Sequence, residues 1–175
     1  MLDLKIEEQG GFGLAMVMAR KGVDAGAIAR ALGMPAPELP RWQARDGLTL
    51  LGVGPGVWLA HAETAPADLA QTLQSALGPL ASVSDQSSGY LIQRLSGPGA
   101  RTLLQRGAAI DFHPSAFGPG SVATTVIAHI GVIVWQVDDA PSYHVAFFRS
   151  FAGSFRHWLD AAAAIPDTPI RARFP

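Results

Sequence analysis

The sequence contains no cysteine, few charged residues and no long hydrophobic run. Without cysteine the chain has no disulfide, no thiol nucleophile and no cysteine-ligated zinc site. Its longest apolar stretch runs from Val126 to Trp135 and is interrupted by His129, whereas a membrane-spanning helix needs about 20 apolar residues. The segment from Met1 to Gln9 mixes acidic and basic side chains and lacks the pattern of a signal peptide. We therefore expect a cytoplasmic protein without a membrane segment.

The scarcity of charge also bears on the partners of the protein. Charged residues make up 15% of the chain and apolar residues 49%, whereas typical domains have about 25% charged residues. A surface this poor in charge indicates that another protein covers part of it. A compact domain rich in alanine and glycine, with no special partner, is the alternative. The 13 lysines and arginines are scattered and the net charge is −1, so no basic patch for nucleic acid is present.

The chain length and the hydrophobic pattern predict one domain. We expect an ordered core over about residues 10–165 and a C-terminal tail over 166–175 of the 175-residue chain. Asp24, Thr64 and Ser150 are placed to cap helix N-termini, and Gly33 to end the first helix. The pattern predicts helices over 25–32, 67–77, about 98–106 and 151–164, and strands over 14–20, 48–53, 57–61, 82–85, 90–95, 122–129, 132–137 and 143–148.

Two glycine-containing turns indicate that the strands pair antiparallel. Gly54-Pro55-Gly56 separates two predicted strands, and a second hairpin is expected around Gly131. Residues 34–47 and 107–121 are predicted loops. The first half follows a β-α-β-β-α-β order, which is typical of a split βαβ arrangement. The sequence therefore predicts an α+β fold of antiparallel sheets with short flanking helices.

The candidate reactive groups do not form a recognisable catalytic constellation. The glycines of residues 52–56 precede a strand rather than a helix N-terminus, so they do not match a nucleotide-binding loop. His129 and His144 lie on predicted neighbouring strands near Asp138 and Asp139, where a metal site is conceivable; ordinary hydrogen-bonded histidines are the alternative. The adjacent aspartates precede Ala140-Pro141 and favour a turn over acid–base chemistry. We expect a non-catalytic protein.

The aromatic residues divide between a core and a possible interface. Trp135 lies within the most apolar segment and is a predicted core residue, and Trp158 is expected to face the core from the last helix. Trp58 fits either a core or an interface position. Phe147 and Phe148 are consecutive on a strand, so their side chains point to opposite faces. One of them needs a partner surface if one face of the sheet is open.

Several short motifs carry a family resemblance. Asp85-Gln86-Ser87 and the segment 95–101 (LSGPGAR), followed by Leu103-Leu104, resemble the folate-binding aminomethyltransferase superfamily. A larger set is similar to the gamma subunit of heterotetrameric sarcosine oxidase, and it comprises Leu95-Ser96-Gly97-Pro98, residues 109–114 (AIDFHP), Phe117, residues 134–143 (VWQVDDAPSY) and Arg149-Ser150-Phe151. The resemblance extends over most of the chain.

The resemblance implies a fold like the N-terminal domain of the aminomethyltransferases and an accessory role. The gamma-type subunit has no cofactor of its own and belongs to a complex that oxidatively demethylates sarcosine or related N-methyl compounds and passes the one-carbon unit to tetrahydrofolate. FAD, FMN, NAD and tetrahydrofolate are implied in the partners, which are large alpha- and beta-type flavoprotein subunits and a small delta-type subunit. The residues expected to hold local geometry or the interface are Trp58, Asp85, Ser87, Arg94, Pro98, Arg101, His113, Pro114, Trp135, Asp138, Tyr143, Arg149, Ser150 and Trp158.

Two other functions remain open from the sequence. A free-standing folate-binding or one-carbon protein on the same fold would use Asp85 as the candidate folate ligand. An orphan protein-interaction module is the third hypothesis. Whether the chain is an accessory subunit or an orphan interaction module, the isolated chain is expected to pair with a second copy through exposed apolar surface.

Overall fold

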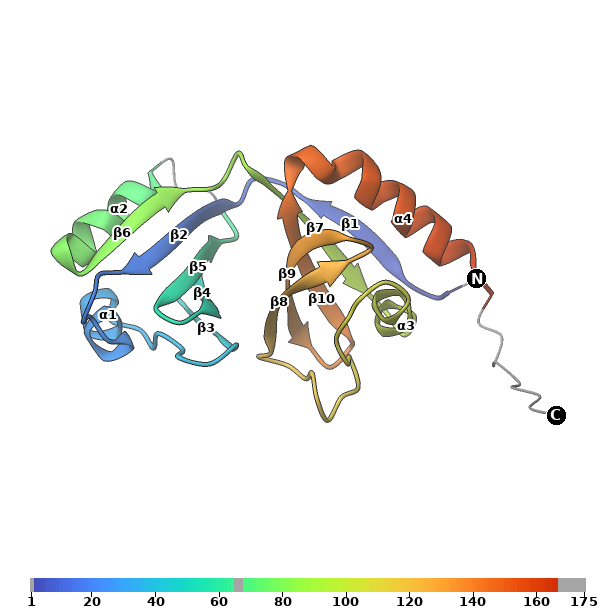
Figure 1. The fold of residues 1–175 in the computed structure, drawn as a ribbon, viewed down its shortest axis with the longest axis horizontal. Helices are drawn as coiled ribbons and strands as arrows, with labels where there is room; N and C mark the ends of the chain where they lie inside the picture. Colours follow the sequence, from blue (N-terminus) through green and yellow to red (C-terminus); the bar gives the residue numbers. More distant parts are fainter. Residues whose placement is uncertain (1, 65–67, 167–175) are drawn as a thin grey trace.

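The computed structural model describes residues 2–64 and 68–166. Within these residues, strands form two five-stranded antiparallel sheets that pack face to face, with helices on the two outer sides (Figure 1). Sheet I has the order β3 (Trp42–Arg45), β4 (Leu48–Gly54), β5 (Val57–Ala62), β2 (Gly13–Ala19), β6 (Ala81–Asp85). Sheet II has the order β1 (Lys5–Gln9), β7 (Tyr90–Ser96), β10 (Ser142–Phe148), β9 (Ile130–Asp138), β8 (Val122–Ile127).

The helices flank the sheets, as the sequence predicts, and the structure places them on the outer faces. Helices α1 (Ala25–Leu32) and α2 (Leu69–Leu77) cover sheet I, and α3 (Ala100–Gln105) and α4 (Ala152–Ala164) cover sheet II (Figure 1). Short 3-10 turns, η1 (Gly78–Leu80) and η2 (Arg149–Phe151), precede β6 and α4. The order β4-β5-β2-β6, with α1 and α2 as the two crossovers, is the predicted split βαβ arrangement. The α+β prediction is confirmed.

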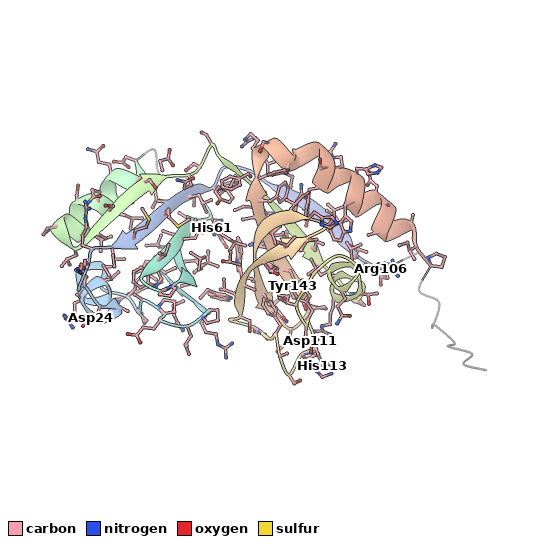
Figure 2. All side chains as sticks on the ribbon, in the orientation of Figure 1. Asp24, His61, Arg106, Asp111, His113 and Tyr143 are labelled. Atoms are coloured by element: carbon pink, nitrogen blue, oxygen red, sulfur yellow. The ribbon has the colours of Figure 1, made fainter. Side chains whose placement is uncertain are left out.

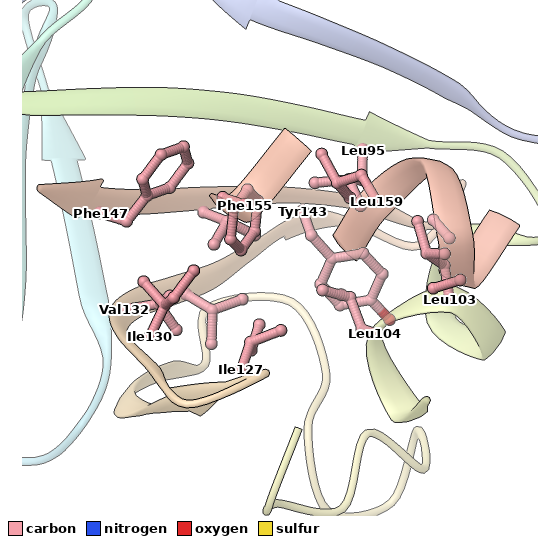
Figure 3. Packing of buried hydrophobic residues seen from close by; sticks show 14 of the residues in the cluster. Leu95, Leu103, Leu104, Ile127, Ile130, Val132, Tyr143, Phe147, Phe155 and Leu159 are labelled. Carbon is pink, nitrogen blue, oxygen red and sulfur yellow. The ribbon is translucent and has the colours of Figure 1, made fainter. Parts of the chain in front are cut away.

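The core lies in three layers because each strand alternates its side chains between two faces. On β7, Tyr90 and Ile92 point between the sheets, and Leu91 and Leu95 point toward the helices of sheet II. The layer under those helices is the largest and includes Phe147 stacked on Phe155, with ring centroids 4.2 Å apart (Figure 3). Both faces of each sheet are therefore covered, which explains the nearly continuous apolar strands.

Helix α1 begins and ends where the sequence predicts. The Asp24 carboxylate accepts a 2.7 Å hydrogen bond from the Ala27 N–H, and Gly33 ends the helix with a left-handed φ of 65°. The other two predicted caps are wrong. Asp68 occupies the N-cap position of α2 instead of Thr64, and the predicted first residue of that helix lies outside the described residues. Ser150 lies within the 3-10 turn η2, and α4 begins after Phe151.

Two edge strands were not predicted. Strand β1 pairs with β7, and β3 lies at the edge of sheet I within the segment predicted to be a loop. Most of their side chains are exposed, so they lack the apolar alternation that marks a half-buried strand. Main-chain pairing to a neighbour forms these strands, and that pairing leaves little trace in a local sequence pattern.

The turn between β8 and β9 also differs from the prediction. Ile127 pairs with Ile130, so the two-residue turn is Ala128-His129, with φ values of 49° and 67°. Positive φ at both central residues is the geometry of a type I′ hairpin. Gly131 lies in β9 opposite Val126 and not in the turn. None of the helices among residues 2–64 and 68–166 has the length and apolar character to cross a membrane.

Candidate functional site

The motif at Asp85 forms a hydrogen-bonded turn between β6 and β7. The Asp85 carboxylate accepts hydrogen bonds from the Ser87 hydroxyl (2.7 Å) and the Ser87 N–H (3.0 Å). These bonds lower the pKa of the exposed Asp85 carboxyl, the side-chain bond most strongly. The Ser87 hydroxyl also accepts a 2.9 Å hydrogen bond from the Leu14 N–H at the start of β2. Asp85 and Ser87 therefore attach the turn to the neighbouring strand.

Arg149 holds the other side of the same turn. Its Nε donates to the Ser88 carbonyl (2.9 Å), and a terminal nitrogen donates to the Tyr90 carbonyl (3.3 Å). The Arg149 N–H donates to the Gly89 carbonyl at 2.8 Å. The β6–β7 turn is thus fixed to β2 on one side and to the end of β10 on the other.

The large aromatic residues fill the layers of the core. Trp58 is buried on the outer face of sheet I and donates a 2.7 Å hydrogen bond from Nε1 to the Pro37 carbonyl, so it is a core residue. Trp158 is partly buried and packs near Phe155, with ring centroids 5.3 Å apart. Tyr143 is fully buried; burial raises the pKa of its hydroxyl, and the nearby Arg101 guanidinium opposes this rise.

The predicted loop residues stabilise turns. The His113 N–H donates to the Asp111 carboxylate at 2.7 Å, and the His113 ring bonds the Ser115 hydroxyl at 2.8 Å. Asp138 ends β9 and accepts a 2.9 Å hydrogen bond from the Ala140 N–H, as expected of a turn residue. Of the two prolines in the predicted set, Pro98 lies just before α3, and Pro114 is exposed in the loop after His113. In the part of the chain that the structure describes, no group of three or more histidine or carboxylate residues could hold a metal ion.

A polar pocket of about 280 Å³ opens between the two sheets. His61, labelled in Figure 2, is on β5 of sheet I. His144 is on β10 of sheet II, and the centroids of the two rings are 6.2 Å apart. Trp135 lies beside both rings, at centroid distances of 5.8 Å from His61 and 5.1 Å from His144. The residues that line the pocket are Gln9, Gly10, Phe12, His61, Glu63, Arg94 and His144.

The pocket contains buried polar groups without protein partners. Neither ring nitrogen of His144 nor Nε of Arg94 has a hydrogen-bond partner among the described residues. Burial, assisted by the charges of His61 and Arg94 and opposed by Asp138, lowers the pKa of His144 to about 4. Burial also lowers the pKa of His61, against the opposing effect of Glu63. Both rings are therefore neutral at pH 7.

Arg94 belongs to the predicted set, but its association with His61 and His144 was not predicted. The sequence paired His144 with His129, which lies in the β8–β9 turn. The strand alternation in the sequence correctly places Arg94 on the same face as Tyr90 and Ile92. The structure adds that Arg94 lies opposite His144 in the β7–β10 register. The contribution of His61 depends on how the two sheets face each other, and no local pattern encodes that packing.

A second depression, which we call the α4 groove, lies on the outer face of sheet II. It has a volume of about 710 Å³, and it lies between α4 and strands β1 and β7. Leu91, Phe147, Phe155 and Leu159 contribute apolar side chains to its lining. Polar side chains also line it, namely Glu8, Gln93, Arg156 and Asp160.

Two exposed phenylalanines lie where β10 connects to α4. Phe147 is buried, whereas Phe148 on the opposite face is 50% exposed and contacts the Tyr90 ring at a centroid distance of 4.6 Å. Phe151 is 42% exposed. We call Phe148 and Phe151 the apolar corner. Exposed aromatic side chains are enriched on surfaces that bind another protein.

Comparison with known families decides the affiliation of the chain. The model of the sarcosine oxidase, gamma subunit family matches residues 18–165. The chain belongs to this family. It is 34% identical over 148 residues to the sarcosine oxidase gamma subunit of Corynebacterium sp. (strain U-96), an alignment covering 84% of this chain and 71% of that subunit. It is 32% identical over 148 residues to the gamma subunit of an Arthrobacter species, covering 84% of this chain and 72% of that subunit.

Solved structures agree with membership in the gamma subunit family. A chain of the heterotetrameric sarcosine oxidase from Corynebacterium sp. U-96 superposes with a TM-score of 0.81 and 31% identity, covering 91% of this chain and 83% of that one. The aminomethyltransferase T of the Bartonella henselae glycine cleavage system superposes with a TM-score of 0.64 and 16% identity, covering 91% of this chain and 46% of that one. The second likeness shows the shared fold and confirms the predicted aminomethyltransferase-like architecture.

Proposed function

We propose that this chain is the gamma-type accessory subunit of a heterotetrameric, sarcosine oxidase-like flavin complex. The observation that carries the proposal is the family match over residues 18–165. The superposition on a chain of a heterotetrameric sarcosine oxidase, with a TM-score of 0.81, supports it. In this role the chain contributes binding surface and structural support, while the reaction takes place on other subunits.

The composition and the surface of the chain support a docked state. Only 15% of its residues are charged, and the apolar corner of Phe148 and Phe151 is exposed. Burial of about 100 Å² of apolar surface is worth roughly 2.5 kcal/mol, so two covered phenylalanines would contribute measurably to assembly. We propose that the apolar corner is part of the contact with a large subunit.

The finer assignments are proposals that rest on the family. The partners would be alpha- and beta-type flavoprotein subunits and a delta-type subunit, which hold FAD, FMN, NAD and tetrahydrofolate in a cytoplasmic complex. The complex would oxidatively demethylate sarcosine or a related N-methyl amine and transfer the one-carbon unit to tetrahydrofolate. The residues of this chain would perform no step of that chemistry.

Co-expression with the three other subunits tests the proposal. A tag on this chain should recover a stoichiometric complex with flavin absorbance and sarcosine-dependent reduction of oxygen. The double variant Phe148→Ser/Phe151→Ser should recover less of the large subunits, whereas Leu39→Ser, which removes an exposed apolar side chain elsewhere, should recover as much as the wild type. The proposal fails if the tagged chain elutes alone while the other subunits assemble and turn over sarcosine without it.

A further inference from the structure

The pocket between the sheets has features of a ligand site that an accessory role does not require. His144 is 9% exposed and its ring nitrogens have no hydrogen-bond partner among the described residues, and the neighbouring His61 is 5% exposed. A buried polar group without a partner costs about 1–3 kcal/mol, and more where it is charged. The arrangement therefore calls for an acceptor inside the pocket.

The charges of the pocket indicate the chemistry of that acceptor. Arg94 forms no ion pair within the described residues, although Glu7 lies directly opposite it on β1. The Glu7 carboxylate is instead within 2.7 Å of the Lys5 ammonium. The planar guanidinium matches a carboxylate, which accepts two parallel N–H hydrogen bonds. A neutral imidazole adds one N–H donor.

We propose that this pocket binds a small carboxylate, with the Arg94 guanidinium as its cationic partner and the His144 ring as a hydrogen-bond donor. The cavity of about 280 Å³ is smaller than the 300–1,000 Å³ typical of sites for drug-sized molecules. It exceeds the roughly 30 Å³ occupied by one water molecule. Its size suits a ligand of a few non-hydrogen atoms, such as acetate or glycine.

The exposed Glu63 carboxylate is the acidic group in the lining of the pocket and limits what enters it. It repels an anion with more than one charge, such as sulfate, more strongly than a monocarboxylate. It also offers a partner for the ammonium group of an amino acid. A monocarboxylate and a zwitterion carry the same recognised group, and either one satisfies the proposal.

Binding should be linked to protonation of His144. The charged and titratable groups that act on its ring are His61, Arg94 and Asp138, and Glu63 acts on His61. A bound carboxylate would offset the positive charge of Arg94 and favour the protonated ring. The affinity for the carboxylate should therefore increase as the pH is lowered from 7 toward 5, closer to the pKa of about 4 of the unliganded ring.

Titration of the full chain with sodium acetate and with glycine tests the proposal, with sodium chloride and sodium sulfate as ionic controls. We expect a saturable rise of Tm with acetate or glycine beyond that with the two salts. Arg94→Gln should weaken binding at least tenfold, and Arg30→Gln on the outer helix α1 should not. If neither acetate nor glycine raises Tm more than the two salts do, the pocket holds water and no carboxylate, and the proposal is overturned. A response to sulfate alone, or full affinity in Arg94→Gln, also overturns the proposal.

A second measurement keeps the test valid if Arg94→Gln does not fold. The ring carbon-bound proton of His144, assigned in the NMR spectrum by its loss in His144→Leu, should shift saturably with acetate or glycine in the wild-type chain. An unchanged His144 signal at saturating carboxylate overturns the proposal. This test uses the chain alone, so its result is independent of whether the chain assembles with flavoprotein subunits.

Discussion

His144 shows how one buried titratable residue links the fold to pH. Its pKa is lowered to about 4 in the folded chain, whereas an unfolded histidine titrates near 6.5. The unfolded state therefore binds the proton first as the pH falls, and the free energy of unfolding decreases between pH 6.5 and pH 4. From pH 7 to pH 5 this single group should cost about 2 kcal/mol.

Urea unfolding at pH 7 and pH 5 in a buffer without carboxylates measures this loss. His144→Leu removes the titrating ring, so its free energy of unfolding should fall about 2 kcal/mol less between the two pH values than that of the wild type. His157→Gln, at an exposed position of α4, serves as the control and should keep the wild-type difference. Equal pH dependence in all three proteins would contradict the assignment.

Ser87 offers a residue-scale test of the β6–β7 turn. Its hydroxyl accepts the Leu14 N–H and donates to the Asp85 carboxylate. Ser87→Ala leaves a partly buried N–H without an acceptor, which should lower the free energy of unfolding by about 1–2 kcal/mol. Ser88→Ala is the matched control, because the structure uses only the backbone carbonyl of Ser88. Denaturant unfolding of the two variants should differ by at least 1 kcal/mol, and equal stability would refute the role of the hydroxyl.

At the scale of elements, Gly52 shows how β4 accommodates the loop before β3. A Cβ at this position would lie 2.5 Å from the Leu39 carbonyl oxygen and 3.1 Å from that of Pro37. Backbone atoms cannot move aside easily, so Gly52→Ala should destabilise the protein by about 2 kcal/mol or more. Gly131→Ala, in β9 with nothing within 4 Å of the added Cβ, should be neutral or slightly stabilising. Thermal unfolding of the pair checks the contrast, and a similar Tm for both variants would contradict it.

The elements that the sequence predicts are those with a strong local signal. Helix α1 has a capping aspartate and a terminal glycine, and both make the predicted contacts. The edge strands β1 and β3 are mostly exposed and form only through pairing with a neighbour. The β8–β9 turn uses Ala128 and His129 at positive φ, a conformation that is uncommon for residues other than glycine. Local chemistry therefore predicts capped helices and central strands, and long-range pairing determines the rest.

The same distinction applies to the whole molecule and its candidate site. The alternation along β7 placed Arg94 on the face of Tyr90 and Ile92, and the structure agrees. The pocket forms because sheet II meets sheet I and brings His61 against His144. The contact between the sheets is a property of the tertiary packing, so the sequence alone does not predict that these residues lie together. The residue patterns predicted only a non-catalytic protein that binds partners, whereas the family resemblance predicted the specific gamma-type subunit.

The exposed apolar corner makes a final prediction about the isolated molecule. Phe148 and Phe151 are 50% and 42% exposed, and without a partner subunit they remain in contact with water. Association of two copies through this surface would bury both side chains in each copy. Sedimentation velocity of the isolated chain should therefore show a concentration-dependent monomer–dimer equilibrium. Phe148→Ser/Phe151→Ser should weaken it at least tenfold and Leu39→Ser should not, whereas a monomer at every concentration, or an equal effect of Leu39→Ser, would exclude the corner as the contact.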